Sequence, residues 1–431
     1  MIFTGGHRSP SLCGAVILLV IATAAVARAA DDAAPVAITH ARVYVPGGHA
    51  PLDDATVVLS GGKVQAVGPT ARIPPKARIV EARGKVVTPG FIDVDTTLGV
   101  VDVEMEASSN DTDVRGALVP ALRMVDGYNP RSILVPIARA SGVTSVVVAP
   151  RAGVLSGQSA FVDLAGDSLA ESVVRPVLAQ GAHVDELAAE QSAGTRGGMW
   201  LMLRTALDDA RFYAAHKAQY DANGARPLSL PRSGLEALLP VLRGEEPLAV
   251  TAHRASDIAV VLALADEFKL RIVLEGATEA WLMAGELARR KIPVVIDPLE
   301  DLPARFDRLN ARPDNATRLW RAGVPVVLST FSAHQVRLLW QRAGNAVREG
   351  MDHDAAVRAI TEAPADAFGL TGYGRIEPGA VGNVVVWDGD PLQAGSRVEH
   401  VFVRGHEEPL ETRQTLLLKR YRTLPPRLDV R

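Results

Sequence analysis

The middle of the chain alternates short apolar runs with segments of helical period, and this alternation limits the folds open to it. The apolar runs are VTSVVVAP, PLAVTAH, LRIVLEG, IPVVID and VPVVLST. Strands that are apolar along their whole length indicate a parallel sheet covered on both faces. The pattern continues for roughly 275 residues, close to the ~250 typical of a (β/α)8 barrel. We therefore predict an α/β fold with a (β/α)8 TIM-like barrel over residues 89–366. An open doubly wound sheet is the alternative, but no glycine-rich phosphate turn follows the first strand.

Two segments of this region carry clear helix signals. Residues 257–268 place their apolar side chains on one stripe, and Asp257 can start this helix. Residues 335–350 form a second helical pattern that Gly350 closes.

The two ends of the chain have a different pattern. Residues 36–87 contain short segments in which apolar and polar residues alternate, separated by glycine and proline. GNVVVWDGDP and VEHVFVRGHEE show the same pattern near the C-terminal end. This pattern is typical of antiparallel strands joined by turns. We predict one composite β-sandwich built from residues 35–88 and 367–415.

The N-terminus resembles a secretory signal. His7 and Arg8 precede an apolar run at residues 12–26, and Ala-Arg-Ala follows at residues 27–29. The run is shorter than the roughly 20 residues that span a bilayer. We expect residues 1–29 to be a cleaved signal peptide, no membrane span in the mature chain, and a periplasmic or secreted protein. Cys13 is the only cysteine, so the mature chain would have no disulfide or thiolate site.

The charge balance indicates the class of partner. There are 46 basic and 49 acidic residues, with a formal net charge of −3. They are spread along the chain and give no electrostatic footprint for nucleic acid. We expect a small-molecule or short peptide-like ligand.

Several motifs occur together in a specific order: GKVVTPGFIDVDTTLG, DGYNPRSILVPIARASGVTSVVVAP followed by GQSA, HRASDI, EGATEAW and GRIEPGAVGNVVVWDGDP. In this order the chain resembles the amidohydrolase superfamily, and within it the exported imidazolonepropionase-like amidohydrolases. The resemblance implies a distorted barrel with a divalent metal centre, and hydrolysis of a C–N bond in an amide or cyclic amide. In that chemistry a metal-bound water is the nucleophile, and an aspartate from the last strand takes its proton.

The positions that carry the family's ligands are altered in this sequence. The first strand of the family ends P-G-F-I-D-x-H-x-H, and Asp95 and Thr97 occupy the two histidine positions. Thr251 takes the ligand position of the fifth strand, and Gly276 that of the sixth. Phe331 stands where the last strand would supply the general base. The resemblance therefore implies a degenerate metal site, with Asp95 as the one remaining candidate ligand.

Some polar residues near these positions remain candidates. His253 shares strand parity with Thr251 and is the candidate acid-base residue, with a backbone-bonded structural histidine as the alternative. Asp95, His253 and Asp297 could form a remodelled catalytic site, although loops at a barrel mouth are polar in any case. Other strand-end candidates, for substrate binding, are Arg254, Glu279 and His334. His183 and Asp352 are interpreted as helix-start residues.

Three functions remain open. The first is an exported protein of amidohydrolase fold that has lost its usual metal site, is non-catalytic or weakly active, and is a homologue or partner of an active paralogue. The second is an active hydrolase that cleaves an amide or cyclic amide through a rearranged site. The third is a periplasmic small-ligand binding protein. We expect no cofactor for the first, and a divalent metal such as zinc for the second; the resemblance also implies a homo-oligomer.

Overall fold

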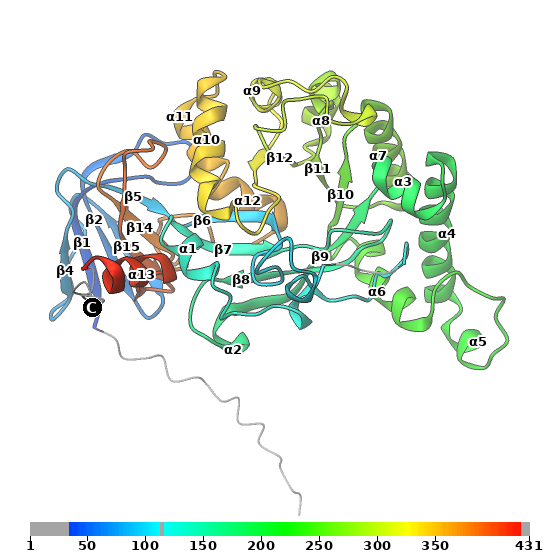
Figure 1. The fold of residues 1–431 in the computed structure, drawn as a ribbon, viewed down its shortest axis with the longest axis horizontal. Coiled ribbons are helices and arrows are strands. Elements are labelled where there is room, and N and C mark those ends of the chain that lie inside the picture. Colours follow the sequence, from blue (N-terminus) through cyan, green and yellow to red (C-terminus); the bar gives the residue numbers. More distant parts are fainter. Residues whose placement is uncertain (1–33, 113–115, 424–431) are drawn as a thin grey trace, which may run out of the picture. The chain divides into compact units, whose positions relative to one another are not determined.

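Eight strands from the middle of the chain form one sheet. The computed structural model describes residues 34–112 and 116–423 (Figure 1). The sheet runs in sequence order through β6 (Phe91–Thr96), β7 (Val143–Val148), β8 (Gly157–Asp163), β9 (Val173–His183), β10 (Leu248–Ala252), β11 (Ile272–Gly276), β12 (Val294–Ile296) and β13 (Val326–Leu328). Inward side chains of these strands, among them Val94, Val147, Val273 and Val327, form one apolar cluster. The α/β barrel predicted from the apolar runs is confirmed.

One strand departs from the all-parallel arrangement that the apolar runs predict. β8 pairs antiparallel with both β7 and β9, whereas the other neighbours are parallel. Only residues 149–156 separate β7 from β8, and residues 164–172 separate β8 from β9. A parallel connection needs a crossover of about a dozen residues or more, so these short links require the chain to reverse direction.

β13 and β6 are the two edge strands of this sheet, and hydrogen bonds to neighbouring segments and side chains connect them. Ile92 N donates to the Ile360 carbonyl and Leu328 N to the Ala359 carbonyl, each at 2.9 Å. The carboxylate of Asp93 accepts from the Thr330 hydroxyl at 2.5 Å and also from the Ser329 hydroxyl. Asp93 is fully buried, and this burial raises its pKa to about 6. The aspartate of the family-like first strand therefore ties the two ends of the sheet together.

Helices flank the barrel strands. They are α1 (Val135–Arg139), α2 (Leu169–Ser172), α3 (Glu186–Ser192), α4 (Arg196–Ala215), α5 (Lys217–Asp221), α6 (Arg232–Leu242), α7 (Ala255–Phe268), α8 (Ala284–Arg290), α9 (Asn315–Arg321), α10 (Leu339–Arg348), α11 (His353–Arg358) and α12 (Glu362–Phe368).

The two helices predicted from sequence are present, with shifted starts. α7 begins two residues before Asp257, and Arg254 is its N-cap. Asp257 instead accepts a hydrogen bond from Arg196 Nε at 3.0 Å. A 3-10 turn (Val336–Leu338) precedes α10, and Gly350 follows it with φ of +95°. Asp352 caps α11 as predicted, because its side chain accepts from Ala355 N at 2.9 Å.

The second sheet combines both ends of the chain. Its strands are β1 (Val36–Val43), β2 (Leu52–Ser60), β3 (Lys63–Gly68), β4 (Arg78–Glu81), β5 (Val86–Pro89), β14 (Val384–Trp387), β15 (Val398–Val403) and β16 (His406–Glu408). β5 pairs antiparallel with β14, which lies beside the blue N-terminal strands in Figure 1. β1 pairs β4 through its first half and β5 through its second half, so the sheet divides there. α13 (Arg413–Tyr421) follows β16.

A buried polar network joins this sheet to the barrel. Asp163, at the end of β8, is fully buried and accepts from Arg404 Nε at 2.6 Å and from the Tyr373 hydroxyl at 3.1 Å. It also accepts from Ser145 Oγ at 2.7 Å and Asn383 Nδ2 at 3.1 Å. These partners come from a barrel strand, from the segment after α12 and from the turns around β14 and β15, so one carboxylate links the two sheets.

The N-terminal segment predicted as a signal peptide lies outside the described residues. Among the helices of the described part of the chain, none has the length and apolar character needed to cross a membrane.

Candidate functional site

Asp95 lies at the mouth of the barrel, in a salt bridge with an arginine. It is next to last in β6 and 2% exposed. Arg151, three residues after β7, places Nη1 2.6 Å from Asp95 Oδ1, and its Nη2 donates to the Asp95 carbonyl at 3.1 Å. Burial raises the pKa of Asp95, and the Arg151 charge opposes that shift. The carboxylate at the family's first ligand position is thus engaged by a guanidinium.

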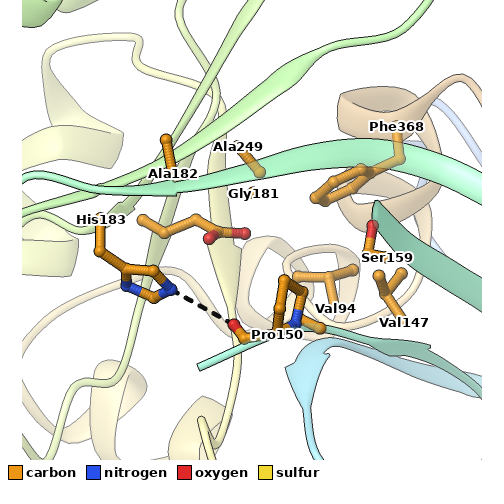
Figure 2. A pocket seen from close by; sticks show the side chains of 11 residues that line it. Val94, Val147, Pro150, Ser159, Gly181, Ala182, His183, Ala249 and Phe368 are labelled. Carbon is orange, nitrogen blue, oxygen red and sulfur yellow. Dashed lines mark hydrogen bonds between the residues drawn. The ribbon is translucent and has the colours of Figure 1, made fainter. Parts of the chain in front are cut away.

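Glu275 is a second buried carboxylate of this region. It lies next to last in β11, is 5% exposed, and lines a small cavity in the barrel. Other residues lining the cavity are Pro150, His183, Ser159 and Phe368, and the space holds about one water molecule (Figure 2). Within residues 34–112 and 116–423, no group donates a hydrogen bond to the Glu275 carboxylate. Burial raises the pKa of Glu275 well above its usual value, the Asp95 charge adds to this, and Arg151 opposes it.

His183 faces the same cavity, a position that sequence reasoning missed. It is the last residue of β9, and α3 begins only after Asp185, whose side chain caps the helix through Ala188 N at 2.8 Å. The interpretation of His183 as a helix-start residue is therefore replaced by a strand-end position. Its Nε2 donates to the Pro150 carbonyl at 3.3 Å (Figure 2), so Nδ1 is the unprotonated nitrogen of the neutral ring. Burial lowers the pKa of His183.

His253 has both ring nitrogens occupied. It follows β10, and its Nε2 accepts from Arg308 Nη2 at 2.9 Å. Nδ1 must then carry the proton, which it donates to Thr278 Oγ1 at 2.8 Å. Burial, followed by the charge of Arg308, lowers the pKa of His253 to about 3. The imidazole is thus neutral at ordinary pH and has no free lone pair with which to accept a proton.

Gly276 provides the space for this ring. A Cβ built on Gly276 would lie 2.5 Å from His253 Cε1 and about 3 Å from both ring nitrogens. Its φ of +74° is also in the left-handed region, which side chains rarely adopt. The position where relatives would carry a histidine is therefore covered by the ring of His253.

Asp297 belongs to a separate cluster. At the end of β12, it accepts from Arg342 Nε and Nη2 at 3.3 and 3.2 Å, and from Leu299 N at 2.9 Å. Burial raises its pKa to about 6, and the Arg342 charge opposes this. In the part of the chain that the structure describes, no hydrogen bond joins Asp95, His253 and Asp297, so the remodelled site predicted from them is not formed by direct contact.

The candidate substrate-binding residues are spread around the rim. Arg254 is exposed and caps α7. Glu279 is buried, and its carboxylate accepts from Ala255 N at 2.9 Å and Asn310 Nδ2 at 2.9 Å, which leaves it structural. His334 is half-buried, and its Nδ1 lies 3.3 Å from Glu104 Oε1. In the described ranges, no hydrogen bond or ion pair joins the side chains of these three residues.

The other altered positions, Thr97, Thr251 and Phe331, carry no side chain that could act as a general base. Thr97 and Thr251 each accept backbone hydrogen bonds through their carbonyls, from Val100 and Val184 respectively. Phe331 is half-buried, packs against the apolar cluster of the barrel interior and has φ of +50°. An aromatic side chain in that backbone region costs on the order of 1 kcal/mol. Its ring can neither accept a proton nor coordinate a metal.

The fold is an α/β barrel with a second sheet built from both ends of the chain. The sequence profile of the amidohydrolase family matches residues 248–408. A solved structure of an amidohydrolase from Thermotoga maritima MSB8 superposes with a TM-score of 0.78 at 28% identity, covering 86% of this chain and 99% of that one. These matches support the assignment of the chain to the amidohydrolase superfamily.

More distant relatives extend this picture. Amidohydrolase tasK of Hapsidospora irregularis is 23% identical over 375 residues, which is 80% of this chain but only 38% of that protein. A β-aspartyl dipeptidase from Fervidobacterium islandicum AW-1 has a TM-score of 0.54 at 12% identity and covers 86% of this chain and 96% of that one, so it shares the fold.

The residues at the mouth do not fit the divalent metal that the superfamily usually binds. The described ranges contain no group of three or more histidine, cysteine, aspartate or glutamate side chains placed to hold an ion. Asp95 is paired with Arg151, both nitrogens of His253 are engaged, and Gly276 has no donor atom. Carboxylates and imidazoles must have free lone pairs to ligate a metal.

His253→Gln is expected to flatten the pH dependence of stability. Because the folded pKa of His253 is about 3 and the unfolded value about 6.5, the unfolded chain binds a proton below pH 6.5 that the folded protein does not. Stability conferred by the neutral ring is therefore lost as the pH falls from 6.5 towards 3. Between pH 7 and 5 the wild type should lose about 2 kcal/mol more than the variant. Urea unfolding at both pH values measures this difference.

The exposed His216→Gln is the matched control, and its pH profile should follow that of the wild type. Asp93 and Asp297 titrate near pH 6 in the opposite sense, but they are present in all three proteins and cancel in the comparison. Parallel profiles for wild type and His253→Gln would contradict the assignment of a neutral buried ring.

Proposed function

We propose that this chain is an exported amidohydrolase-fold protein whose usual metal site is largely lost. It is non-catalytic or weakly active and serves as the partner of an active paralogue. The observation that carries the proposal is that the protein's own cations contact the polar side chains that remain at the barrel mouth. Arg151 engages Asp95 at 2.6 Å, and Arg308 donates to His253 at 2.9 Å.

The chemistry expected of the family also lacks its base. In that chemistry an aspartate from the last strand takes a proton from the attacking water, and Phe331 stands in its place. The Phe331 ring packs against the barrel interior. The cavity beside Glu275 holds about one water, which is too little for an amide substrate.

Apolar residues on the connection after β12 support a protein partner. Leu302, Phe306 and Leu309 are 73%, 78% and 59% exposed. These three exposed apolar side chains follow one another along a single connection, and a large exposed apolar patch on a soluble protein marks an interaction site. The same connection carries Arg308, which contacts His253, so a partner seated there would lie close to the altered mouth. The signal-like segment at residues 1–29 supports export.

Metal analysis of the purified protein tests this proposal. After incubation with zinc or manganese and removal of free ion, we expect far less than one metal per chain. We also expect no hydrolysis of acyl-amino acids, dipeptides or cyclic amides above background. About one tightly bound metal ion per chain would contradict the proposal. Co-purification with a histidine-complete relative would support the partner role, and its absence at micromolar concentrations would count against it.

One observation favours an active hydrolase as the second candidate function. The Glu275 carboxylate is 5% exposed and receives no hydrogen bond from residues 34–112 and 116–423, and buried carboxyl groups of this kind serve as acids or bases in enzymes. If the substrate panel shows turnover, Glu275→Gln should abolish it, while Glu279→Gln, which alters a structural carboxylate, should not.

A further inference from the structure

Two buried carboxylates and one cation meet at the mouth of the barrel. Asp95 and Glu275 are 2% and 5% exposed, and they come from β6 and β11. Arg151 interacts electrostatically with both and makes direct contact with Asp95. Two acids removed from water need a compensating positive charge, because isolated buried carboxylates are strongly disfavoured.

The backbone holds Arg151 in a defined place. The loop at residues 149–156 is anchored by Leu155 N to the Ala117 carbonyl and by Ser156 N to the Gly181 carbonyl, each at 3.0 Å. The Pro150 carbonyl, one residue before Arg151, accepts from His183 at 3.3 Å. Because the loop is pinned on both sides, the guanidinium is positioned before any ligand arrives.

The contact uses both terminal nitrogens of the guanidinium. One nitrogen lies against the Asp95 carboxylate and another donates to the Asp95 carbonyl. A planar fork held at two points is fixed in orientation, unlike the point charge of a lysine. The Arg151 side chain is 23% exposed, so it enters the mouth from the rim.

We propose that the Arg151 guanidinium is the resident cation of this barrel mouth and occupies, by charge, the place of the divalent ion that the superfamily usually carries. This rests on the proposed function, in which no metal is bound. The mismatch between the donor set and a metal is then explained: the Arg151 guanidinium balances the charge of the Asp95 carboxylate, and the raised pKa of Glu275 favours its uncharged form.

The alternative is that Arg151 forms an ordinary salt bridge with no relation to a metal position. The two ideas differ in what happens when the guanidinium is removed. If Arg151 is the resident cation, its removal leaves the buried acidic side chains of Asp95 and Glu275 without a nearby positive charge, and an added divalent ion can supply that charge. If Arg151 forms an ordinary salt bridge, no ion restores the lost stability.

The experiment compares thermal unfolding of full-length wild type and Arg151→Gln, with and without millimolar zinc or manganese. Glutamine keeps much of the length of the side chain and removes the charge. We expect Tm to fall by roughly 5 °C in the variant and to recover at least half of that loss with the metal, whereas the wild type shows no shift. Arg151→Gln/Asp95→Asn should lose the metal response. Arg123→Gln, at an exposed ion pair, should match the wild type throughout.

The outcomes separate the two proposals. If wild type binds metal stoichiometrically, the proposed function fails. If wild type is metal-free and Arg151→Gln is destabilised but shows no metal-dependent rise, only the resident-cation proposal fails; an unchanged Tm in Arg151→Gln also overturns it. Should Arg151→Gln fold poorly, Arg151→Lys is the second test. It keeps the positive charge and should stay insensitive to metal, although the loss of the second contact should lower its Tm below that of the wild type.

Discussion

Asp163→Ala is expected to lower the free energy of unfolding by about 3–5 kcal/mol, the range for removing one partner of a buried ion pair. Asp163 is fully buried and accepts hydrogen bonds from Arg404, Tyr373, Ser145 and Asn383. Its loss leaves all four donors without this acceptor. Because the partners come from both sheets, the substitution should loosen the junction as well as the barrel. Chemical unfolding followed by circular dichroism measures the change.

Two comparisons make this prediction specific. Asp208→Ala removes an exposed carboxylate paired with Arg211 and should leave the free energy of unfolding nearly unchanged. Asp163→Ala/Arg404→Met should recover part of the loss, because the half-buried cation is removed with its partner. A loss below about 1 kcal/mol in Asp163→Ala would show that water replaces the carboxylate at this junction.

The barrel was predictable because its signal is long and regular. Apolar runs such as residues 294–296 and 326–328 are too uniformly apolar for a half-exposed strand, and they are buried along their length as predicted. The reversed β8 was also encoded, in the short links on either side of it, but apolar runs alone do not report strand direction. The pairing of β5 with β14 was predictable in outline, because both ends of the chain carry the same strand pattern. The pairing of β1 with β4 in its first half and with β5 in its second half has no local sequence signal.

The site was only partly predictable. The spacing of the family motif locates Asp95 and Gly276 at the mouth, and both lie there. Arg151 was missed because its partner Asp95 is 56 residues away and its own segment looks like an ordinary loop with glycines. The strand-end position of His183 was missed because Asp185 is a typical N-cap residue and the residues after it have a helical pattern, so His183 was assigned to the start of the helix. Pairings that depend on long-range contact leave no local pattern, so partners of the candidate residues could not be assigned.

A glycine that is confined on one face by a ring gives the second large prediction. Gly276→Ala is expected to destabilise the protein by about 2–4 kcal/mol, because the new Cβ would lie 2.5 Å from His253 Cε1 and the φ of +74° disfavours any side chain. Gly194→Ala isolates the backbone part of this cost, since Gly194 has φ of +69° and open space around it.

Gly194→Ala should therefore cost only about 1 kcal/mol, and the difference between the two variants measures the steric conflict with the His253 ring. Measured in the His253→Ala background, Gly276→Ala should cost no more than Gly194→Ala, because the ring that the new Cβ meets is gone. Equal losses for Gly276→Ala and Gly194→Ala in urea unfolding would show that the ring moves aside freely. If Gly276→Ala is the more costly substitution, then a histidine side chain at position 276 is incompatible with the observed position of the His253 ring. Introducing the family's histidine there would require a second substitution at His253.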